Sequence, residues 1–352
     1  MDSQNLVTET EQLLDGEDLS AEQIAHCVDQ LTSEEINAGL KKNFLIALSQ
    51  KGESDREFSQ FVAEFRNRSI DPQLQDFAPN AIDLCGTGGD KAGSFNISTF
   101  VSFVVASAGV KVIKHGNRSI SSKCGSADLL QAFGIPLQAR PEILRSSLEE
   151  INFAFLFAPE FHPAFKHIAP VRKLLAQEGI ITIFNLLGPT LNPARPAHQI
   201  LGVFAPEHIK KISHALSKNG CSNALIVHGH ISNDRIQGVD ELTACGENLL
   251  LGYGQFSTEE IERWNPERWS QSIHPFEDLK GGDLDHNLRL TDQILSCQCP
   301  PGLFAAILIN ASSAFKVCGR VSTLEEGIEL ADSLIRGGTV KNWLDRAGKF
   351  FA

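Results

Sequence analysis

The first 76 residues carry apolar positions at the spacing of helices. Apolar residues recur at intervals of three and four within 24–31 and again within 44–48, which places them on one helix face. A Ser or Thr followed three residues later by Glu or Gln is typical of a helix start. This pattern begins at Ser20, Thr32 and Ser54. We therefore predict an all-helical N-terminal domain over 1–76.

From Ala81 onward, short apolar runs alternate with amphipathic stretches. The expected strands are 81–85, 110–114, 153–158, 198–204, 223–228 and 246–253. The expected helices between them are 97–108, 126–133, 141–150 and 207–219, with a helical tail over 303–348. Such alternation is typical of an α/β domain with a mostly parallel central sheet. We expect this larger domain to cover 77–352, after a proline-bounded linker at 72–79.

The segment 170–196 interrupts this alternation. Pro170, Pro189, Pro193 and Pro196 punctuate it, which predicts a short helix followed by a long loop. Loops of this length often act as hinges or lids over a site.

Composition and charge narrow the class of protein. The net charge of -12 over 352 residues argues against non-specific nucleic-acid binding, which needs a basic surface. An N-terminus without a basic and apolar leader, and the lack of an apolar run of about 18 residues, favour no membrane association. Eight scattered cysteines predict free thiols in a reducing compartment, hence the cytoplasm. Cys297 and Cys299 are the one close pair, without nearby ligands to complete a metal site.

A glycine-rich stretch is the most informative feature. The run Asp83-Leu-Cys-Gly86-Thr-Gly-Gly-Asp90 is followed by Asn96-Ile-Ser-Thr99; Asp83 interrupts an otherwise apolar strand. Glycines let backbone N–H groups approach a ligand, and Asn96, Ser98 and Thr99 are residues that cap a helix. Strand, glycine loop and helix N-terminus predict a site for phosphate or pyrophosphate. The spacing fits neither the dinucleotide fingerprint nor the Walker loop.

A second polar cluster follows the next predicted strand. It contains Lys114-His-Gly-Asn-Arg118, Ser119-Ile-Ser-Ser122, Lys123 and Gly125-Ser-Ala-Asp128. Open α/β sheets place ligands at the carboxyl ends of their strands, and these cations supply local positive charge. A polar surface loop is the alternative, which two such loops after successive strands make less favourable.

Two further features suit the same ligand. The adjacent acids Asp240 and Glu241 suit Mg²⁺ that also holds a phosphate, although an acidic turn is the alternative. Arg172 suits recognition of a carboxylate, although a solvated helix residue is the alternative. His162 and His228 are more typical of structural histidines than of site residues.

Together these motifs resemble the anthranilate phosphoribosyltransferase family over nearly the whole chain. The resemblance is carried by Gly86-Thr-Gly-Gly-Asp90, Asn96-Ile-Ser-Thr99, Lys114-His-Gly-Asn-Arg118, Gly125-Ser-Ala-Asp128, Phe155-Leu-Phe-Ala-Pro159, His162-Pro163, Pro170-Val-Arg172, Thr182-Ile-Phe-Asn-Leu-Leu-Gly-Pro189, Val227-His-Gly229 and Val239-Asp-Glu241. It implies a small helical domain beside a larger α/β domain, joined in part by the segment about 170–190, with the active site in the hinge cleft. It also implies a homodimer formed through the helical domain.

The resemblance implies a reaction in tryptophan biosynthesis. Phosphoribosyl pyrophosphate and anthranilate would give N-(5-phosphoribosyl)anthranilate and pyrophosphate, with two Mg²⁺ ions per subunit. Anthranilate would contact Gly86, Asn117 and Arg172, and the metal ligands would be Ser98, Asp240 and Glu241. Lys114 and His115 are candidates for electrostatic catalysis. The implied contacts to phosphoribosyl pyrophosphate are Gly86, Gly89, Asp90, Ser94, Asn96, Ile97, Ser98, Thr99, Lys114, His115, Gly116, Asn117, Arg118, Ser119, Ile120, Ser121, Ser122 and Ser126.

One segment departs from the family pattern. The turn at 173–181 is about three residues longer than usual, and Ile181 stands where the family usually has a second arginine. This departure concerns the path by which anthranilate enters. The alternative activities are transfer to another acceptor on the same fold and a pyrimidine-nucleoside phosphorylase, which shares the architecture and a glycine-rich phosphate loop. The alternative classes are a catalytically inactive nucleic-acid-binding relative and a non-catalytic scaffold. The acid pair Asp240–Glu241 and the two phosphate loops favour a phosphoribosyl transferase.

Overall fold

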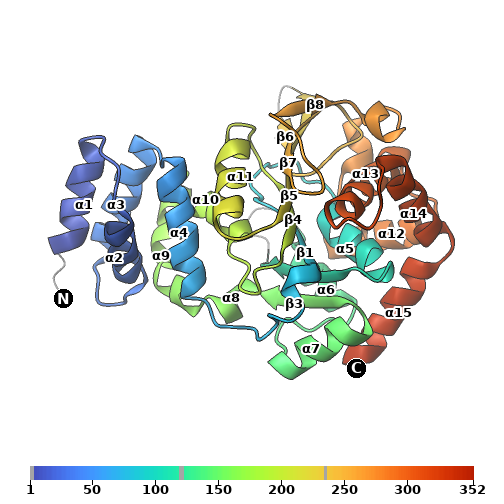
Figure 1. Ribbon diagram of the computed structural model, residues 1–352, viewed down its shortest axis with the longest axis horizontal. Helices are drawn as coiled ribbons and strands as arrows, with labels where there is room; N and C mark the ends of the chain where they lie inside the picture. The colour runs from blue at the N-terminus through green and yellow to red at the C-terminus, as the bar shows by residue number, and fades with distance from the viewer. Residues whose placement is uncertain (1–3, 119–122, 234–235) are drawn as a thin grey trace.

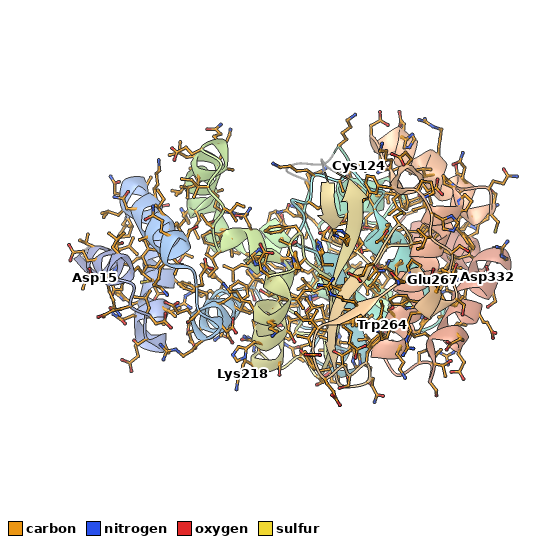
Figure 2. All side chains as sticks on the ribbon, turned by 90° about the horizontal axis from the view of Figure 1, so that it is seen from above. Asp15, Cys124, Lys218, Trp264, Glu267 and Asp332 are labelled. Carbon is orange, nitrogen blue, oxygen red and sulfur yellow. The ribbon has the colours of Figure 1, made fainter. Side chains whose placement is uncertain are left out.

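The computed structural model describes residues 4–118, 123–233 and 236–352, and it has a helical bundle beside a larger α/β unit (Figure 1). Asp15 lies toward the bundle end of the molecule and Asp332 toward the opposite end (Figure 2). The bundle helices are α1 (Gln4–Leu14), α2 (Ala21–Thr32), α3 (Ala38–Lys51) and α4 (Asp55–Asn67).

Helix caps explain two of the three predicted bundle starts. Ser20 and Ser54 precede α2 and α4, and each forms a reciprocal capping box. The capping box predicted at Thr32 is wrong, because Thr32 is the last residue of α2. Helix α3 begins instead at Ala38, where the side chain of Asn37 accepts a hydrogen bond from the backbone. Asn is as good a cap as Ser at this position.

In the described residues the strands form one eight-stranded sheet in the order β3-β2-β1-β4-β5-β7-β8, with β6 paired to β5. The first five strands in that order are parallel, and β6, β7 and β8 are antiparallel to their neighbours. The strands are β1 (Ala81–Gly86), β2 (Lys111–Gly116), β3 (Phe153–Phe157), β4 (His198–Gly202), β5 (Asn223–Asn233), β6 (Ile236–Val239), β7 (Asn248–Tyr253) and β8 (Glu262–Trp264). The prediction of a mostly parallel sheet is therefore confirmed.

Helices cover both faces of this sheet. Those of the α/β unit are α5 (Ile97–Ser107), α6 (Ser126–Ala132), α7 (Pro141–Glu150), α11 (His208–Lys218), α12 (Leu284–Leu295), α13 (Pro301–Val317), α14 (Leu324–Arg336) and α15 (Thr339–Phe351). One apolar core joins α5 and α13–α15 to one face of the sheet. A second core joins α11 and the opposite face to the helical bundle, so α11 lies between the bundle and the sheet (Figure 1).

The segment after β3 returns to the bundle. It contains α8 (Ala158–Phe161), α9 (Ala169–Gln177) and α10 (Phe184–Leu187). Val171 and Leu175 of α9 are buried in the bundle's core. The ring of Phe184 lies edge-on to that of Phe65 in α4, with 5.4 Å between centroids. The residues predicted to form an insert therefore pack on the bundle, although they lie more than 90 residues further along the chain than α4.

Candidate active site

The predicted phosphate loops leave the sheet at the point where its strand order reverses. The chain runs from β1 to β2 and β3 on one side of β1, and then returns to place β4 on the other side. Gly86 and Gly202 pair at the carboxyl ends of β1 and β4. Open parallel sheets bind ligands in the crevice outside the strand ends at such a reversal. The sequence motifs after β1 and β2 therefore lie at the expected edge.

Two glycines allow Asp240 to lie directly over this edge. A Cβ at Gly86 would lie 2.1 Å from Asp240 Oδ2, and a Cβ at Gly202 would lie 1.6 Å from the Asp240 carbonyl oxygen. Side chains at either position would displace the acidic loop. Close approach of Asp240 is thus a structural reason for Gly86, in addition to the ligand contact expected from the sequence.

Two carboxylates accept hydrogen bonds from backbone amides of the predicted phosphate site, and a third, that of Asp90, lies near Asp240. The Gly88 N–H donates to Asp240 Oδ2 at 2.6 Å, and the Ser98 N–H donates to Glu241 Oε1 at 3.1 Å. Asp90 Oδ2 is buried and has no hydrogen-bond partner among the described residues. The acids and the amides therefore face the same space at the end of the sheet.

Burial makes the ionised forms of Asp240 and Glu241 unfavourable, and the positive charge nearby does not fully compensate. Desolvation, reinforced by Asp90 and Glu241, raises the pKa of Asp240 well above its usual range. Desolvation also raises the pKa of Glu241 to about 7, although Lys114 and the Ser98 N–H oppose the shift. Carboxylates whose charge is this costly, together with the orphaned oxygen of Asp90, form a site that a cation would stabilise.

The donor set fits Mg²⁺ rather than a metal held by protein ligands alone. Within the described ranges, no three acidic, histidine or cysteine side chains converge closely enough to hold a metal ion by themselves. Mg²⁺ takes hard oxygen ligands and usually keeps waters and substrate phosphates in its shell. The side chains of Ser98, Asp240 and Glu241 carry oxygen atoms of this kind.

The N-terminus of α5 differs in one detail from its predicted cap. Asn96 occupies the cap position, but its side chain makes no capping hydrogen bond. Instead its amide donates to the carbonyl of Cys124 and its oxygen accepts from Asn287. The Asn96 side chain therefore ties the start of α5 to the segment before α6 and to α12. Ile97 and Thr99 are buried in the first turn.

The residues between the glycine loop and α5 are held in place by the segment 279–280. Gly89 is exposed and adopts a left-handed backbone with φ +82°. Ser94 forms an isolated bridge with Lys280, and the Phe95 N–H donates to the Leu279 carbonyl at 2.8 Å. Residues 279–280 were not singled out from the sequence, because their contribution is through the backbone.

Lys114 and His115 point to opposite faces of β2. Lys114 is only 1% exposed, and its ammonium group donates to the Leu84 carbonyl while also attracting Glu241. The His115 ring lies 5.2 Å from that of His162, and its Nε2 has no partner among the described residues. Burial lowers the pKa of His115 well below its usual range and that of His162 to about 4, so both rings are neutral at pH 7.

The end of the second loop reaches the surface. Gly116 ends β2, and Asn117 and Arg118 are exposed. Arg118 pairs with Asp128, which also accepts a hydrogen bond from the Gly125 N–H at the start of α6; Ser126 is the first residue of that helix. The other predicted contacts, Ser119, Ile120, Ser121 and Ser122, lie outside the described residues.

Arg172 lies on α9, whose buried residues belong to the core shared with the helical bundle. Its guanidinium carbon lies 5.3 Å from the centre of the Phe184 ring, and burial lowers its pKa from the ordinary value. In the part of the chain described, it forms no ion pair. The longer turn that follows is held to α3, where Lys42 pairs with Glu178 and the Ser49 hydroxyl donates to the Ile181 carbonyl.

Sequence reasoning missed residues that support the site from within. His162 was interpreted as a structural histidine, and its Nε2 hydrogen-bonds with the Leu191 carbonyl while its ring lies against that of His115. Asp83 and Asn192 form a buried hydrogen-bonded pair beneath the loops; the charged Asp83 in an apolar strand was the available signal. His228 behaves as expected of a structural histidine, since its Nδ1 hydrogen-bonds with the Val203 carbonyl.

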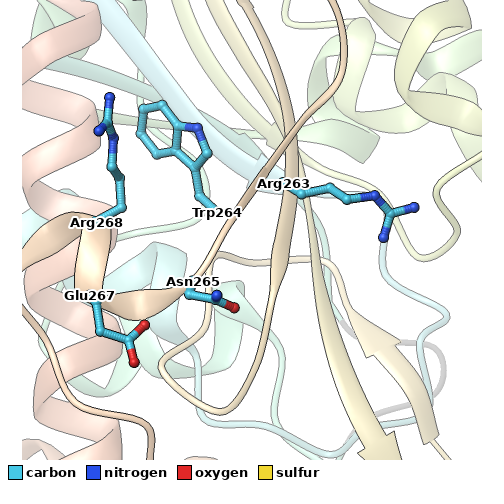
Figure 3. A pocket seen from close by; sticks show the side chains of 5 residues that line it. All are labelled: Arg263, Trp264, Asn265, Glu267 and Arg268. Carbon is cyan, nitrogen blue, oxygen red and sulfur yellow. The ribbon is translucent and has the colours of Figure 1, made fainter.

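A separate surface hollow lies beside β8 (Figure 3). Its lining residues are Arg263, Trp264, Asn265, Glu267 and Arg268, and none was predicted for the site. The guanidinium carbon of Arg268 lies 4.9 Å from the centre of the Trp264 ring. Arg263 extends away from both side chains and forms an ion pair with Glu247. These arginines already have partners within the chain, so the hollow does not compete with the strand ends as the site.

Comparisons with known proteins agree with this geometry. Residues 9–69 match the helical bundle domain of a glycosyl transferase family, and residues 78–341 match its a/b domain. An anthranilate phosphoribosyltransferase of Synechococcus elongatus is 37% identical over 97% of this chain and 95% of its own length. One from Desulfosudis oleivorans is 37% identical over 96% of each chain.

Two solved structures share the whole fold. Anthranilate phosphoribosyltransferase from Thermus thermophilus superposes with a TM-score of 0.86 at 36% identity, covering 97% of this chain and 98% of that chain. The Saccharomyces cerevisiae enzyme, solved with PRPP and Mg, has a TM-score of 0.86 at 24% identity and covers 99% of this chain and 98% of that chain. With its helical domain, α/β domain and loop motifs in matching order, this chain belongs to the anthranilate phosphoribosyltransferases of the glycosyl transferase family.

Proposed function

We propose that this protein transfers the phosphoribosyl group of phosphoribosyl pyrophosphate to the amine of anthranilate, in tryptophan biosynthesis. The observation that carries the proposal is the convergence of both phosphate loops, Lys114 and the acid pair at one edge of the sheet. Relatives that are 37% identical over nearly the full chain carry the name of this activity. A nucleoside phosphorylase would not need the acid pair.

The protein's main chemical task is to stabilise charge on the departing pyrophosphate. Pyrophosphate leaves from C1 of the ribose, which develops oxocarbenium character, the C1–N bond to anthranilate forms, and the nitrogen releases one proton to give the neutral secondary amine. The glycine-loop amides, the N-terminus of α5 and the Lys114 ammonium would hold the pyrophosphate oxygens, because preorganised donors favour the charge that develops there. Their fixed positions on strand ends and a helix end suit that role.

Acceptor binding would depend mainly on position. The anthranilate amine is aromatic and unprotonated at neutral pH, so a strong general base is not required. Arg172 would hold the anthranilate carboxylate, and Asn117 and the backbone at Gly86 would orient the ring. Bringing the amine close to C1 then supplies much of the rate. His115 is neutral and buried, so it would contribute as a dipole rather than as a cation.

We also propose two Mg²⁺ ions per subunit. Ser98 with Glu241 would hold one ion, and Asp240 with Glu241 the other. When bound, the ions would neutralise negative charge on the pyrophosphate. The raised pKa of Glu241 and the orphaned oxygen of Asp90 support a cation at this place. So does the yeast protein of the same fold, which was solved with Mg.

Phosphoribosyl pyrophosphate would contact both loops. Gly86, Gly89, Asp90, Ser94 and 96–99 would bind it after β1, and 114–122 with Ser126 after β2. The site would lie in a hinge cleft between a helical domain at 1–76, joined by 170–190, and an α/β domain at 77–352. The matched bundle and a/b regions, 9–69 and 78–341, support that division.

We propose a homodimer formed through the helical domain. Val7 and Leu14 of α1 are 40% and 62% exposed, and Leu174 of α9 is 44% exposed. Helix α3 packs against both α1 and α9, so these apolar side chains belong to one helical unit that a second copy would cover. Sedimentation of the wild type and of Leu14→Glu tests this: a dimer that Leu14→Glu weakens supports the proposal, and a wild-type monomer contradicts it.

The expected compartment is the cytoplasm. None of the helices in the described residues is long and apolar enough to cross a bilayer. No disulfide forms among the described residues, which include all eight cysteines. Unlinked thiols suit a reducing compartment.

The loss of anthranilate fluorescence tests the activity. Purified protein is mixed with anthranilate, phosphoribosyl pyrophosphate and Mg²⁺, with a chelator control. Turnover that stops with the chelator supports the proposal. Binding of phosphoribosyl pyrophosphate without turnover would assign another acceptor, and no binding of it would reject the phosphoribosyl site.

A further inference from the structure

The parallel pairing of β1 with β2 gives way to side-chain bridges near the site. Ala81 pairs with Lys111 and Ile82 pairs with Val112. By contrast, the ladder of β1 with β4 continues to Gly86 and Gly202, and that of β2 with β3 continues to Gly116 and Phe157. Among the described residues that follow Ile82 in β1, the contacts to β2 are made by side chains. The two strands that carry the phosphate loops are therefore spaced by side chains at their ends.

Lys114 supplies one bridge, by donating from β2 to the Leu84 carbonyl of β1; Asp83 and Asn192 supply the others. Asp83 Oδ1 accepts a hydrogen bond from the His115 N–H at 3.2 Å, and Asp83 Oδ2 accepts one from Asn192 Nδ2 at 2.9 Å. Asn192 Nδ2 also donates to the Ile113 carbonyl at 2.8 Å, and its Oδ1 accepts from the Ala194 N–H at 3.0 Å. Every polar atom of the pair has a partner, and the partners fix which end of the Asn192 amide is which.

The pair is fully inside the protein. Asp83 is 0% exposed and Asn192 is 3% exposed. A buried carboxylate is costly unless it is hydrogen-bonded and its charge is balanced. Here Lys114 attracts it, and Asn192 and the His115 N–H donate to it; burial still raises the pKa of Asp83 to about 6, so the group is ionised at neutral pH. A packed apolar residue would fill this space at lower cost, which points to a functional reason for the acid.

We propose that Asp83 and Asn192 are positioning residues that set the spacing between the Gly86–Asp90 loop and the Lys114–Arg118 loop for phosphoribosyl pyrophosphate. Asp83 precedes the first loop on β1, and its carboxylate holds the backbone at the start of the second. Asn192 links both to the segment after the Gly188–Thr190 turn. The pair touches no substrate; it acts through the residues that do. This inference rests on the proposed function.

Asp83→Asn tests the carboxylate with almost no change in size. Both neighbours of Asp83 donate hydrogen bonds, so an amide at this position would direct its NH₂ group at a donor. It would also remove the charge beside Lys114. We expect kcat/KM for phosphoribosyl pyrophosphate to fall by about tenfold or more. The rise in its KM should exceed that for anthranilate, because Arg172 packs against Phe184 of α10 rather than against this pair.

A stability-matched control separates positioning from general weakening. Leu148 is buried in the apolar cluster that also contains Ile113, and Leu148→Ala lowers stability without removing a hydrogen bond of the pair. Both variants should melt below the wild type, but only Asp83→Asn should raise the KM for phosphoribosyl pyrophosphate. An unchanged KM in Asp83→Asn would overturn the inference.

Asn192→Ala provides a second route if Asp83→Asn does not fold. It keeps the carboxylate and removes the bridge to Ile113, so the same KM should rise, and an unchanged KM would count against the pair. Where both single variants fold, the double variant should lose less than the product of the single losses, since the residues act as a unit. Multiplicative losses would refute the coupling. Calorimetric titration with phosphoribosyl pyrophosphate gives the same comparison if the wild type does not turn over anthranilate, so failure of the proposed activity is distinguished from failure of this inference.

Discussion

Replacing Gly202 by alanine tests whether close packing of Asp240 on the sheet sets the geometry of the metal site. The added Cβ would lie 1.6 Å from the Asp240 carbonyl oxygen and 2.2 Å from its carbonyl carbon. Non-bonded atoms are stable at roughly 3.5–4.0 Å, so the backbone at Asp240 must retreat by roughly 2 Å. Gly202 itself offers no side chain to a ligand. Its substitution therefore acts on the site through the acidic loop.

The expected size of the effect follows from overpacking. An extra methyl in a packed site costs about 1–3 kcal/mol and occasionally more. If the cost falls on metal and substrate binding, apparent Mg²⁺ affinity drops by about 5- to 150-fold, because 1.4 kcal/mol is a factor of ten. If it falls on folding, an unfolding entropy of roughly 0.7 kcal/mol/K for a chain of this length gives a melting temperature lower by about 1–4 °C.

Initial rates titrated with Mg²⁺, with scanning calorimetry on the same samples, separate these outcomes. Gly252→Ala is the matched control, because its Cβ would lie 2.1 Å from the Phe256 carbonyl oxygen, a backbone clash in the same sheet away from Asp240. We expect both variants to lose stability and only Gly202→Ala to need more Mg²⁺. If both melt lower and keep the wild-type Mg²⁺ dependence, the reasoning that places the metal beside Asp240 is refuted.

Three other changes test the site. Arg172→Ala should raise the KM for anthranilate by about 10- to 100-fold, the value of a charge-assisted hydrogen-bonded pair, and equal effects on both substrates in steady-state kinetics would contradict the assignment. Asp240→Asn should weaken the Mg²⁺ dependence of the rate, whereas an unchanged Mg²⁺ titration would remove Asp240 from the metal site. Burial raises the pKa of Asp83 to about 6 from 3.8, so the folded protein keeps a proton that the unfolded chain loses between these values, and this contribution to stability declines as pH rises through that window. Calorimetry should show the melting temperature of the wild type falling relative to Asp83→Asn between about pH 4 and 6; a constant difference would contradict the shift.

Local patterns predicted strands β1 to β5 and the antiparallel strand β7 well, but they missed β6 and β8. Strands β1 to β5 each begin within one residue of the predicted start, although β5 continues to Asn233, beyond its predicted end at 228. Strand β8 is Glu262–Trp264, a polar edge strand without alternation that periodicity can detect. Helix α12 was missed although Asp283 caps it and leucine or isoleucine recurs along 284–295. A short edge strand such as β8 is stabilised by its pairing with the neighbouring strand, and a local sequence pattern carries no information about that pairing.

Candidate site residues were identifiable where they have a chemical signature of their own. Glycines, a basic cluster and adjacent acids mark the loops, and the structure places Gly86, Lys114 and the acid pair around the same strand ends. Nothing in the local pattern indicates that the Gly88 and Ser98 amides donate to those acids, since such a contact joins residues about 150 positions apart. The cap at Thr32 failed for a different reason. The residues fit the pattern of a helix start, but the preceding helix continues through Thr32.

Asp83 shows how a violated local rule can indicate function before its partner is known. A carboxylate within a buried strand opposes the apolar pattern on both sides of it, so some other part of the fold must compensate for its burial. The compensation comes from Lys114, from the backbone of His115 and from Asn192, which lies 109 residues further along the chain. Each of these groups belongs to or adjoins a segment that approaches the proposed substrate. An apolar side chain at this position would contribute more to stability than a buried carboxylate does. The Asp83 carboxylate is therefore better explained as a group that holds these segments in place.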